Sequence, residues 1–235
     1  MSSTDIFPVH IIGHIRTEFA AKFGVPRQSG LAPDLLAKIV FVPEYRNADA
    51  LRGIQDYDYL WLIWQFSRAV REGWSPTVRP PRLGGNTRMG VFATRSPFRP
   101  NAIGLSSVKL VKVEPDTAEG PVIWVAGADL MDNTPILDIK PYLPFTDSHP
   151  NARAGFTEHT GAHHLEVEYA PGTLQAVPPE KQSALTQVLS QDPRPAYQND
   201  PARVYGMAFA GLEVHFTVQE GTLCVTEVQK SGNQA

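Results

Sequence analysis

The chain has 235 residues, of which 42% are hydrophobic and 19% charged, and its net charge is −3. This length fits one large domain, or a medium domain with a small appendage. No apolar run approaches the ~20 residues needed to span a bilayer, and the N-terminus has no signal-peptide pattern. The single cysteine, Cys224, excludes an internal disulfide framework and favours a reducing cytoplasm. Its place between Leu223 and Val225 predicts a small core residue.

The first part of the chain is predicted to be dominated by strands. Runs of β-branched and apolar residues indicate strands in six places: residues 10–15, 38–43, 57–66, 89–94, 102–113 and 121–126. The most apolar run, 57–66, is expected to be a strand buried on both faces. The stretch 16–34 is expected to be a loop, and residues 47–53 a single helical turn ended by Gly53. Residues 129–138 begin as a turn, and prolines keep 139–144 extended.

The second part changes character after residue 147. Residues 147–161 are polar and predict a surface loop and a boundary. Beyond it we expect a helix at 180–190, with Leu185, Val188 and Leu189 on one stripe, and four strands: residues 164–169, 204–209, 212–217 and 222–228. The predicted fold is therefore mainly β: a β-barrel-like N-terminal domain (1–147), a polar linker (148–163) and a small α+β C-terminal domain (164–235).

The most informative stretch is residues 79–105, RPPRLGGNTRMGVFATRSPFRPNAIGL, which we call the arginine segment. It contains five arginines and no acidic residue, inside a slightly acidic chain. Such a local cationic block suits a polyanion or a ligand with a carboxylate. Arginine favours planar, bidentate recognition of phosphate or carboxylate. The segment fits no phosphate-loop motif, so Gly84 and Gly85 are expected to supply left-handed turn conformations.

Two other chemistries are weakly supported. Ser96 and Ser106 could be nucleophiles, but no GxSxG motif surrounds either of them. A metal site is conceivable from neighbouring histidines and acids, which are His159, His163, His164, Glu158 and Glu166. Because they occupy a polar stretch, we interpret these histidines as solvated surface residues and expect no metal.

Arg95 and the acidic turn at 129–132 (DLMD) each allow two interpretations. Arg95 could form a structural ion pair with Asp129 or Asp132, or it could bind a ligand carboxylate or the RNA backbone. The density of neighbouring arginines favours the second interpretation. A carboxylate in the acidic turn could accept a hydrogen bond from a ribose hydroxyl or from an adenine amine. Asp and Asn are also common turn residues, which is the second interpretation.

Several segments, in one order along the chain, resemble the TrmO/TsaA (YaeB-like) tRNA methyltransferases. They are IGHIRTEF, KFGVPRQSGL, RGIQDYDYLWLIWQF, GWSPTVRPPRLGGN, GVFATRSPFRPNAIGLS, DLMDNTPILDIKPYLPF and QDPRPAY. The resemblance covers nearly all of residues 11–147 and a patch at 191–197. It implies a homodimeric β-barrel enzyme, unlike Rossmann methyltransferases. The implied reaction uses S-adenosylmethionine to methylate N6 of threonylcarbamoyladenosine beside the anticodon of threonine tRNAs.

The resemblance also implies site residues. Those expected to bind the cofactor are Pro26, Arg27, Gln28, Phe66, Ser67, Arg95, Leu105, Asp129, Leu130, Met131 and Asp132. The family often has a histidine where this chain has Ser67. The residues expected to bind RNA are Arg79, Arg82, Arg88 and Arg99 of the arginine segment, with Arg194 on phosphate and Tyr197 stacking on a base. Asp132 and Asp138 are the candidates for the catalytic base.

Two alternatives stay open from the sequence. The barrel could bind tRNA or a nucleoside without catalysis, or it could methylate a small molecule. Methyl transfer from a sulfonium needs an in-line approach, so positioning can supply most of the rate. An adenine N6 that bears an acyl group is acidic enough for a modest base to help remove its proton.

Overall fold

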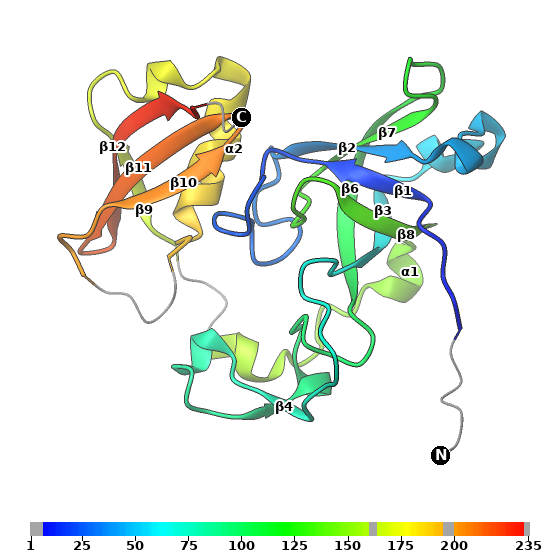
Figure 1. Cartoon of the computed structure of the whole chain (residues 1–235), viewed down its shortest axis with the longest axis horizontal. Helices are drawn as coiled ribbons and strands as arrows, with labels where there is room; N and C mark the ends of the chain where they lie inside the picture. The colour runs from blue at the N-terminus through cyan, green and yellow to red at the C-terminus, as the bar shows by residue number, and fades with distance from the viewer. Residues whose placement is uncertain (1–6, 160–163, 195–199, 233–235) are drawn as a thin grey trace.

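A computed structural model describes residues 7–159, 164–194 and 200–232, without the side chains of Arg82 and His159. Within these residues, no helix is long and apolar enough to cross a membrane. A barrel and a four-stranded sheet lie side by side (Figure 1). The chain between β3 and β6, which includes most of the arginine segment, extends away from one end of the barrel.

Six strands close the barrel, in the order β1-β2-β7-β6-β3-β8. They are β1 (Gly13–Arg16), β2 (Leu36–Phe41), β3 (Tyr59–Gln65), β6 (Ile103–Glu114), β7 (Val122–Ala126) and β8 (Thr134–Pro141). Every neighbouring pair is antiparallel. The predicted barrel and the mainly β fold are thus confirmed.

Strand β3 is buried on one face only, so the expectation of a strand buried on both faces was wrong. Leu60, Leu62 and Trp64 point into the barrel, whereas Tyr59 is 45% exposed on the outside. A closed barrel has a single core, and side chains of a strand alternate between its two faces. Strand β6 shows the predicted alternation.

Short elements fill the long connections. The 3₁₀ turns are η1 (Pro43–Tyr45), η2 (Ala48–Leu51), η3 (Ile54–Asp56), η4 (Pro81–Leu83), η5 (Val91–Ala93), η6 (Gly155–His159) and η7 (Leu174–Ala176). The pair β4 (Thr77–Val78) and β5 (Met89–Gly90) forms a small hairpin, and α1 (Pro144–Asp147) is a single helical turn. Gly84 and Gly85 are left-handed as predicted, with φ of 74° and 72°.

One predicted strand boundary in these connections was wrong, and one predicted loop contains short elements. The strand expected at 89–94 ends at Gly90, because the Thr94 amide donates to the Val91 carbonyl at 3.2 Å and closes a 3₁₀ turn. The Thr94 hydroxyl donates to the same carbonyl at 2.9 Å. Residues 147–161 are not wholly irregular, since they contain the end of α1 and all of η6. The Asp147 carboxylate stabilises α1 by accepting from the Leu143 amide at 2.9 Å.

The C-terminal part is a sheet of order β10-β11-β12-β9 with one helix packed on it. Its elements are β9 (Glu166–Tyr169), α2 (Pro179–Ser190), β10 (Tyr205–Phe209), β11 (Leu212–Gln219) and β12 (Thr222–Lys230). The predicted stripe on α2 is confirmed, since Leu185, Val188 and Leu189 are buried. Cys224 is only partly buried, contrary to prediction, because it points to the opposite face of β12 from Leu223 and Val225.

The connection between β1 and β2, which we call the 17–35 loop, belongs to both halves of the molecule. Phe19, Ala32 and Leu35 are fully buried in the core of the C-terminal sheet. The Phe19 ring meets the Phe209 ring edge-on, with centroids 5.7 Å apart. A segment predicted only as a loop therefore joins the barrel to the C-terminal sheet. The division of the chain at residues 147 and 163 stays a prediction.

Candidate functional site

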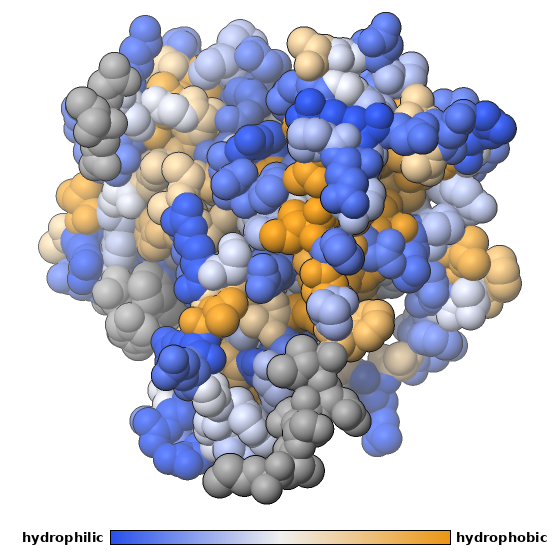
Figure 2. All heavy atoms as spheres, turned by 45° about the vertical axis from the view of Figure 1, so that its right-hand side comes forward, coloured by the Kyte–Doolittle hydropathy of each residue, from blue (hydrophilic) through white to orange (hydrophobic). Residues whose placement is uncertain are grey.

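A pocket of about 1070 Å³ opens beside the barrel, between the 17–35 loop and the arginine segment. This volume is at the upper end of the range for small-molecule sites, roughly 300–1,000 Å³. Figure 2 shows hydrophobic side chains in the central hollow of one face of the molecule, with hydrophilic side chains around them. Exposed apolar residues that line the pocket include Phe92, Ile103 and Leu105.

Four separate parts of the chain build the pocket lining. They are residues 21–28 of the 17–35 loop, the end of β3 with residues 66–71, residues 92–105, and the turn 129–134. All eleven residues predicted to bind the cofactor lie in this lining. Their assignment to a cofactor stays a prediction, but the fold does bring them together from distant positions in the sequence.

Aromatic side chains form the middle of the pocket. The rings of Trp64 and Phe66 are in edge-to-face contact, with centroids 4.3 Å apart. Trp64 covers its cross-strand partner Gly104, where a Cβ atom would lie 2.3 Å from Trp64 Cε2. A glycine at this position is therefore required for the indole to lie against β6.

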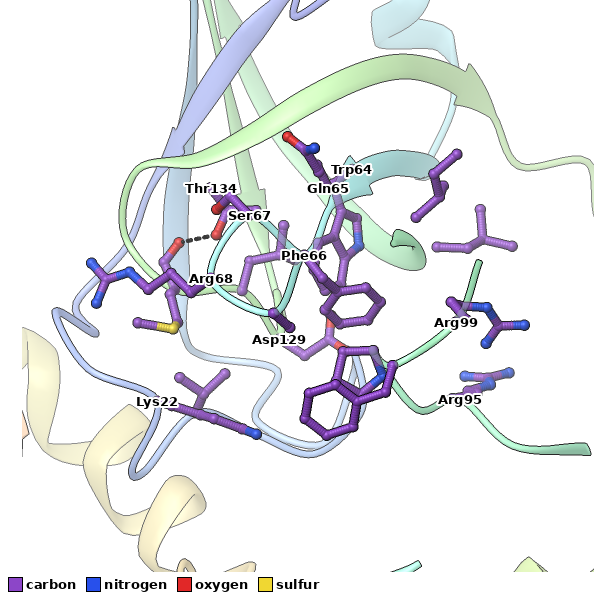
Figure 3. Close-up of a pocket in the computed structure, with 18 of the residues that line it drawn as sticks. Lys22, Trp64, Gln65, Phe66, Ser67, Arg68, Arg95, Arg99, Asp129 and Thr134 are labelled. Atoms are coloured by element: carbon purple, nitrogen blue, oxygen red, sulfur yellow. Dashed lines mark hydrogen bonds between the residues drawn. The ribbon is translucent and has the colours of Figure 1, made fainter. Parts of the chain in front are cut away.

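A chain of hydrogen bonds runs from the barrel interior into the pocket. Trp64 Nε1 donates to Ser106 Oγ at 3.0 Å, and Ser106 Oγ donates to Asp129 Oδ1 at 2.5 Å. Burial raises the pKa of Asp129 above its ordinary value, although the hydrogen bond from Ser106 and the charge of Arg95 act in the opposite direction. Asp129 lies beside Phe66 in the pocket (Figure 3).

The predicted cofactor arginines are held by polar partners. Arg95 donates to the side chain of Gln28, so no ion pair with Asp129 or Asp132 fixes it. Arg27 donates to the backbone oxygens of Asp192 at 2.9 Å and Arg194 at 3.1 Å. The C-terminal unit thus anchors the predicted cofactor residues of the 17–35 loop.

The two candidates for the catalytic base are placed differently. Asp132 lines the pocket, but one of its oxygens accepts from the Thr17 amide at 3.0 Å and the other lies 3.8 Å from Arg16. Asp138 is absent from the pocket lining and lies 2.8 Å from Lys140. Both carboxylates therefore hold local structure, and Asp138 has no access to the pocket from its position on β8.

The residues predicted to bind RNA do not form one group. Arg79 and Arg88 are exposed outside the pocket, whereas Arg99 lines it and donates to the Thr94 carbonyl at 3.1 Å. Arg194 is only 9% exposed and pairs with Asp192 through two hydrogen bonds of 2.8 and 3.0 Å. The Arg82 side chain and Tyr197 lie outside the described residues.

Several residues of the pocket were not predicted from the sequence. Lys22 and Arg68 lie on the side of the pocket away from Arg95 and Arg99 (Figure 3). In the part of the chain that the structure describes, no side chain pairs with Lys22 or Arg68. Trp64 looks like an ordinary strand residue in the sequence. Ser106, which the sequence suggested only as a possible nucleophile, is buried on β6 and does not line the pocket.

Exposed aromatics next to the arginines were also missed. Trp74 is 55% and Phe92 is 72% exposed, and their ring centroids are 6.1 Å apart. The Arg71 guanidinium lies over the Phe98 ring, 4.0 Å from its centroid. The interleaving of aromatic residues with arginines was a signal that could have found them.

No group of three or more metal-ligating side chains occurs among the described residues. Of the histidines considered for a metal site, His164 contacts the Gln191 side chain at 3.2 Å. His163 and the His159 side chain lie outside the described residues.

Comparison with known proteins identifies the family of this chain. The profile of the tRNA-methyltransferase O N-terminal domain matches residues 14–148, and that of the TrmO C-terminal domain matches residues 162–231. The chain belongs to the tRNA-methyltransferase O family. The resemblance inferred from the sequence motifs is thus confirmed.

Individual members of the family align over most of the chain. A tRNA (adenine(37)-N6)-methyltransferase of Escherichia coli strain K12 is 40% identical over 222 residues, covering 91% of this chain and 94% of that protein. A putative S-adenosylmethionine-dependent methyltransferase of Pseudomonas aeruginosa is 39% identical over 213 residues, covering 87% and 90%. A crystal structure of TrmO from Pseudomonas aeruginosa superposes with a TM-score of 0.78 at 32% identity, covering 96% of this chain and 100% of that chain.

Proposed function

We propose that this protein is an S-adenosylmethionine-dependent tRNA methyltransferase that acts on N6 of threonylcarbamoyladenosine next to the anticodon of threonine tRNA. The observation that carries the proposal is the convergence of eleven residues, expected from the family motifs, on one pocket. The relatives support the reaction type, because one is named for methylation of N6 of adenine 37 in tRNA and another for dependence on S-adenosylmethionine.

The pocket lining fits S-adenosylmethionine chemically. The cofactor has a carboxylate, a sulfonium and an adenosine. Arg95 suits the carboxylate, and the ring of Phe66 suits the sulfonium, which is a cation. The acidic turn offers acceptors for hydroxyl and amine groups. When bound, the cofactor would supply an electrophilic methyl group.

The residues around the pocket suit an RNA substrate. Exposed Arg79 and Arg88 are suited to the phosphate backbone, and the neighbouring Trp74 and Phe92 rings to stacking on unpaired bases. An anticodon loop presents such bases, since sequence-specific RNA recognition favours single-stranded loops. Methyl transfer then depends mainly on holding the acceptor nitrogen in line with the methyl group.

The threonylcarbamoyl group of the proposed substrate carries its own carboxylate. The pocket therefore has to accommodate two carboxylates, one on the cofactor and one on the substrate. Lys22 and Arg68, on the side away from Arg95, offer a second cationic end. We assign this end to the threonyl carboxylate, which gives the pocket a means to distinguish the modified adenosine from an unmodified one.

The proposal includes three further statements. The pocket-bearing barrel (1–147) and the C-terminal domain (164–235) act as two domains joined by the linker 148–163. The enzyme works as a homodimer, which would bring two sets of basic residues to one tRNA. It resides in the cytoplasm, where its substrate tRNA is found and its free cysteine is stable.

The decisive experiment uses labelled S-adenosylmethionine and total tRNA prepared with and without the threonylcarbamoyl modification. Transfer of label to modified tRNA alone supports the full proposal. Cofactor binding without transfer to either tRNA points instead to a small-molecule acceptor. If no cofactor binds at all, the non-catalytic binding barrel becomes the better interpretation.

A further inference from the structure

Two large aromatic side chains lie next to each other in solvent at the edge of the pocket. Trp74 is 55% exposed and Phe92 is 72% exposed, and their ring centroids are 6.1 Å apart. Phe92 lines the pocket, whereas Trp74 lies outside its lining. We call this pair the aromatic platform. Single exposed apolar residues are common on globular proteins, but adjacent large rings beside a pocket indicate an interaction surface.

The backbone beneath the aromatic platform is held by hydrogen bonds. Thr77 pairs with Gly90 in the β4–β5 hairpin, and the Val91 amide donates to the Pro76 carbonyl at 2.9 Å. Val91 is only 1% exposed and anchors η5, whose next residue is the exposed Phe92. The hairpin therefore brings together two rings that are 18 positions apart in the sequence and keeps them in solvent.

The chain around the aromatic platform is cationic. Residues 66–105 contain seven arginines and a single acidic residue, Glu72. The Arg71 guanidinium lies over the Phe98 ring, 4.0 Å from its centroid, and both residues line the pocket. Rings interleaved with arginines are typical of surfaces that bind single-stranded nucleic acid, because bases stack on the rings and the backbone follows the positive charges.

The spacing of the two rings decides how a base can bind to them. A base inserted between two rings needs about 7 Å, twice the ~3.4 Å rise per base. The centroids of Trp74 and Phe92 are closer than this, and the ring planes are inclined by 33°. The pair is thus one surface rather than a slot, and a base would stack on its solvent side. Because Phe92 also lines the pocket, that base would be a covalent neighbour of the nucleotide in the pocket.

We propose that the aromatic platform stacks the base next to the target adenosine in the anticodon loop, and that this contact holds the target adenosine in the pocket. The inference rests on the proposed function and deepens it, because it names the nucleotide that the platform binds. Stacking tolerates any base, since every base has a π face. The platform therefore responds to the presence of a flanking base and not to its identity. Trp74 and Phe92 are positioning residues for the target nucleotide.

The test uses an anticodon stem-loop RNA that contains threonylcarbamoyladenosine, and two versions of it in which one or the other flanking nucleotide is abasic. With the wild-type protein, one abasic site should weaken binding by about 5- to 150-fold, the range for loss of one stacked base. Trp74→Ala should weaken binding of the intact RNA by a similar factor. It should bind that abasic RNA no more weakly than the wild type does, which is the coupling expected for partners in contact. Fluorescence anisotropy measures these affinities.

Two further variants serve as controls. Trp74→Phe keeps a ring and should recover most of the affinity for the intact RNA. Phe7→Ala removes another exposed ring, 89% exposed and outside the pocket lining, and should bind this RNA as the wild type does. Stacking releases no counterions, so Trp74→Ala should keep the wild-type salt dependence, unlike Arg79→Ala.

Three outcomes would overturn the inference. The first is that the wild-type protein binds both abasic RNAs as tightly as the intact RNA. The second is that the effects of the abasic site and of Trp74→Ala multiply, since the base and the ring would then act independently. The third is a change of oligomeric state of Trp74→Ala in sedimentation, which would make the platform a contact between copies of this chain.

Methylation of the intact RNA by the wild-type protein is measured separately. Coupling between Trp74 and a flanking base without methylation would overturn the proposed function and support the inference that the platform binds RNA by stacking. Methylation without coupling would support the proposed function and overturn this inference.

Discussion

At the scale of the residue, the side chains around Trp64 pack so closely that a larger side chain at Gly104 would collide with the indole ring. Gly104 lies under the Trp64 indole, and Trp64 donates to Ser106. The Gln28 side chain accepts a hydrogen bond from Arg95 at the pocket. The sequence marked Arg95 and Gln28 through the family motifs. It suggested Ser106 only as a possible nucleophile and did not mark Trp64, because only the pairing of β3 with β6 makes them neighbours.

The first prediction concerns Gly104→Ala. Its Cβ would meet the Trp64 ring at 2.3 Å, so the indole or strand β6 must move, at a cost of about 1–3 kcal/mol. We expect a lower free energy of unfolding and weaker cofactor binding, measured by thermal unfolding and calorimetry. Gly90→Ala is the matched control, because a Cβ there meets nothing within 4 Å. Equal stability of the two variants would contradict the packing argument.

The second prediction concerns Arg95→Ala. Loss of a charged hydrogen bond to the cofactor carboxylate costs roughly 1.5–3 kcal/mol, so S-adenosylmethionine should bind about 10- to 100-fold more weakly. Arg52→Ala, which removes an exposed arginine paired only with Asp49, is the control for a general loss of charge. Unchanged affinity of the Arg95 variant by calorimetry would remove Arg95 from the cofactor site.

At the scale of the element, the 17–35 loop connects the pocket to the C-terminal sheet. One part of the loop carries the pocket residues Pro26, Arg27 and Gln28. Another part places Phe19 in the C-terminal core. The composition of this stretch predicted a loop, because glycine and proline interrupt it. Composition could not predict where this loop packs, because the surface that receives Phe19 is formed by residues almost 200 positions further along the chain.

The third prediction tests this coupling with Phe19→Ala and Val188→Ala. Both remove fully buried side chains of the C-terminal core, so both should lower the free energy of unfolding, Phe19→Ala by about 3–5 kcal/mol. Only Phe19→Ala should also weaken cofactor binding, because Phe19 holds the loop that contributes to the pocket. Calorimetry well below the unfolding temperature separates the two effects, and equal affinities would show that the loop is positioned without the C-terminal core.

At the scale of the whole molecule, charge is distributed unevenly. The net charge is −3, yet six cationic side chains and two acidic ones line the pocket. Arg79 and Arg88, beside the paired residues Val78 and Met89 of the small hairpin, are also exposed. An acidic protein with a local cationic surface should bind RNA at one place rather than over its whole surface.

The fourth prediction concerns the salt dependence of tRNA binding. Arg79→Ala and Arg88→Ala should each weaken tRNA binding. Each should also make the negative slope of log K against the logarithm of salt concentration shallower by about one, as expected when one phosphate contact is lost. Cofactor affinity should not change, because neither residue lines the pocket. Filter binding at several salt concentrations measures the slope. A slope that stays at the wild-type value would place the RNA backbone elsewhere.

The sequence alone determined the family and the strand-rich composition, and its motifs marked eleven of the residues that line the pocket. Motifs are local, and the alternation of apolar residues along a strand is visible without its partners. Only the tertiary structure decided which of these side chains pair with another residue and which of them line the pocket. The Arg194 guanidinium is hydrogen-bonded to Asp192, and Asp138 lies outside the pocket. Asp129 accepts a hydrogen bond from Ser106, and Ser106 accepts one from Trp64, because β6 lies between β3 and β7 in the sheet. Contacts of this kind depend on strand register and loop docking, which the order of residues along the chain does not reveal.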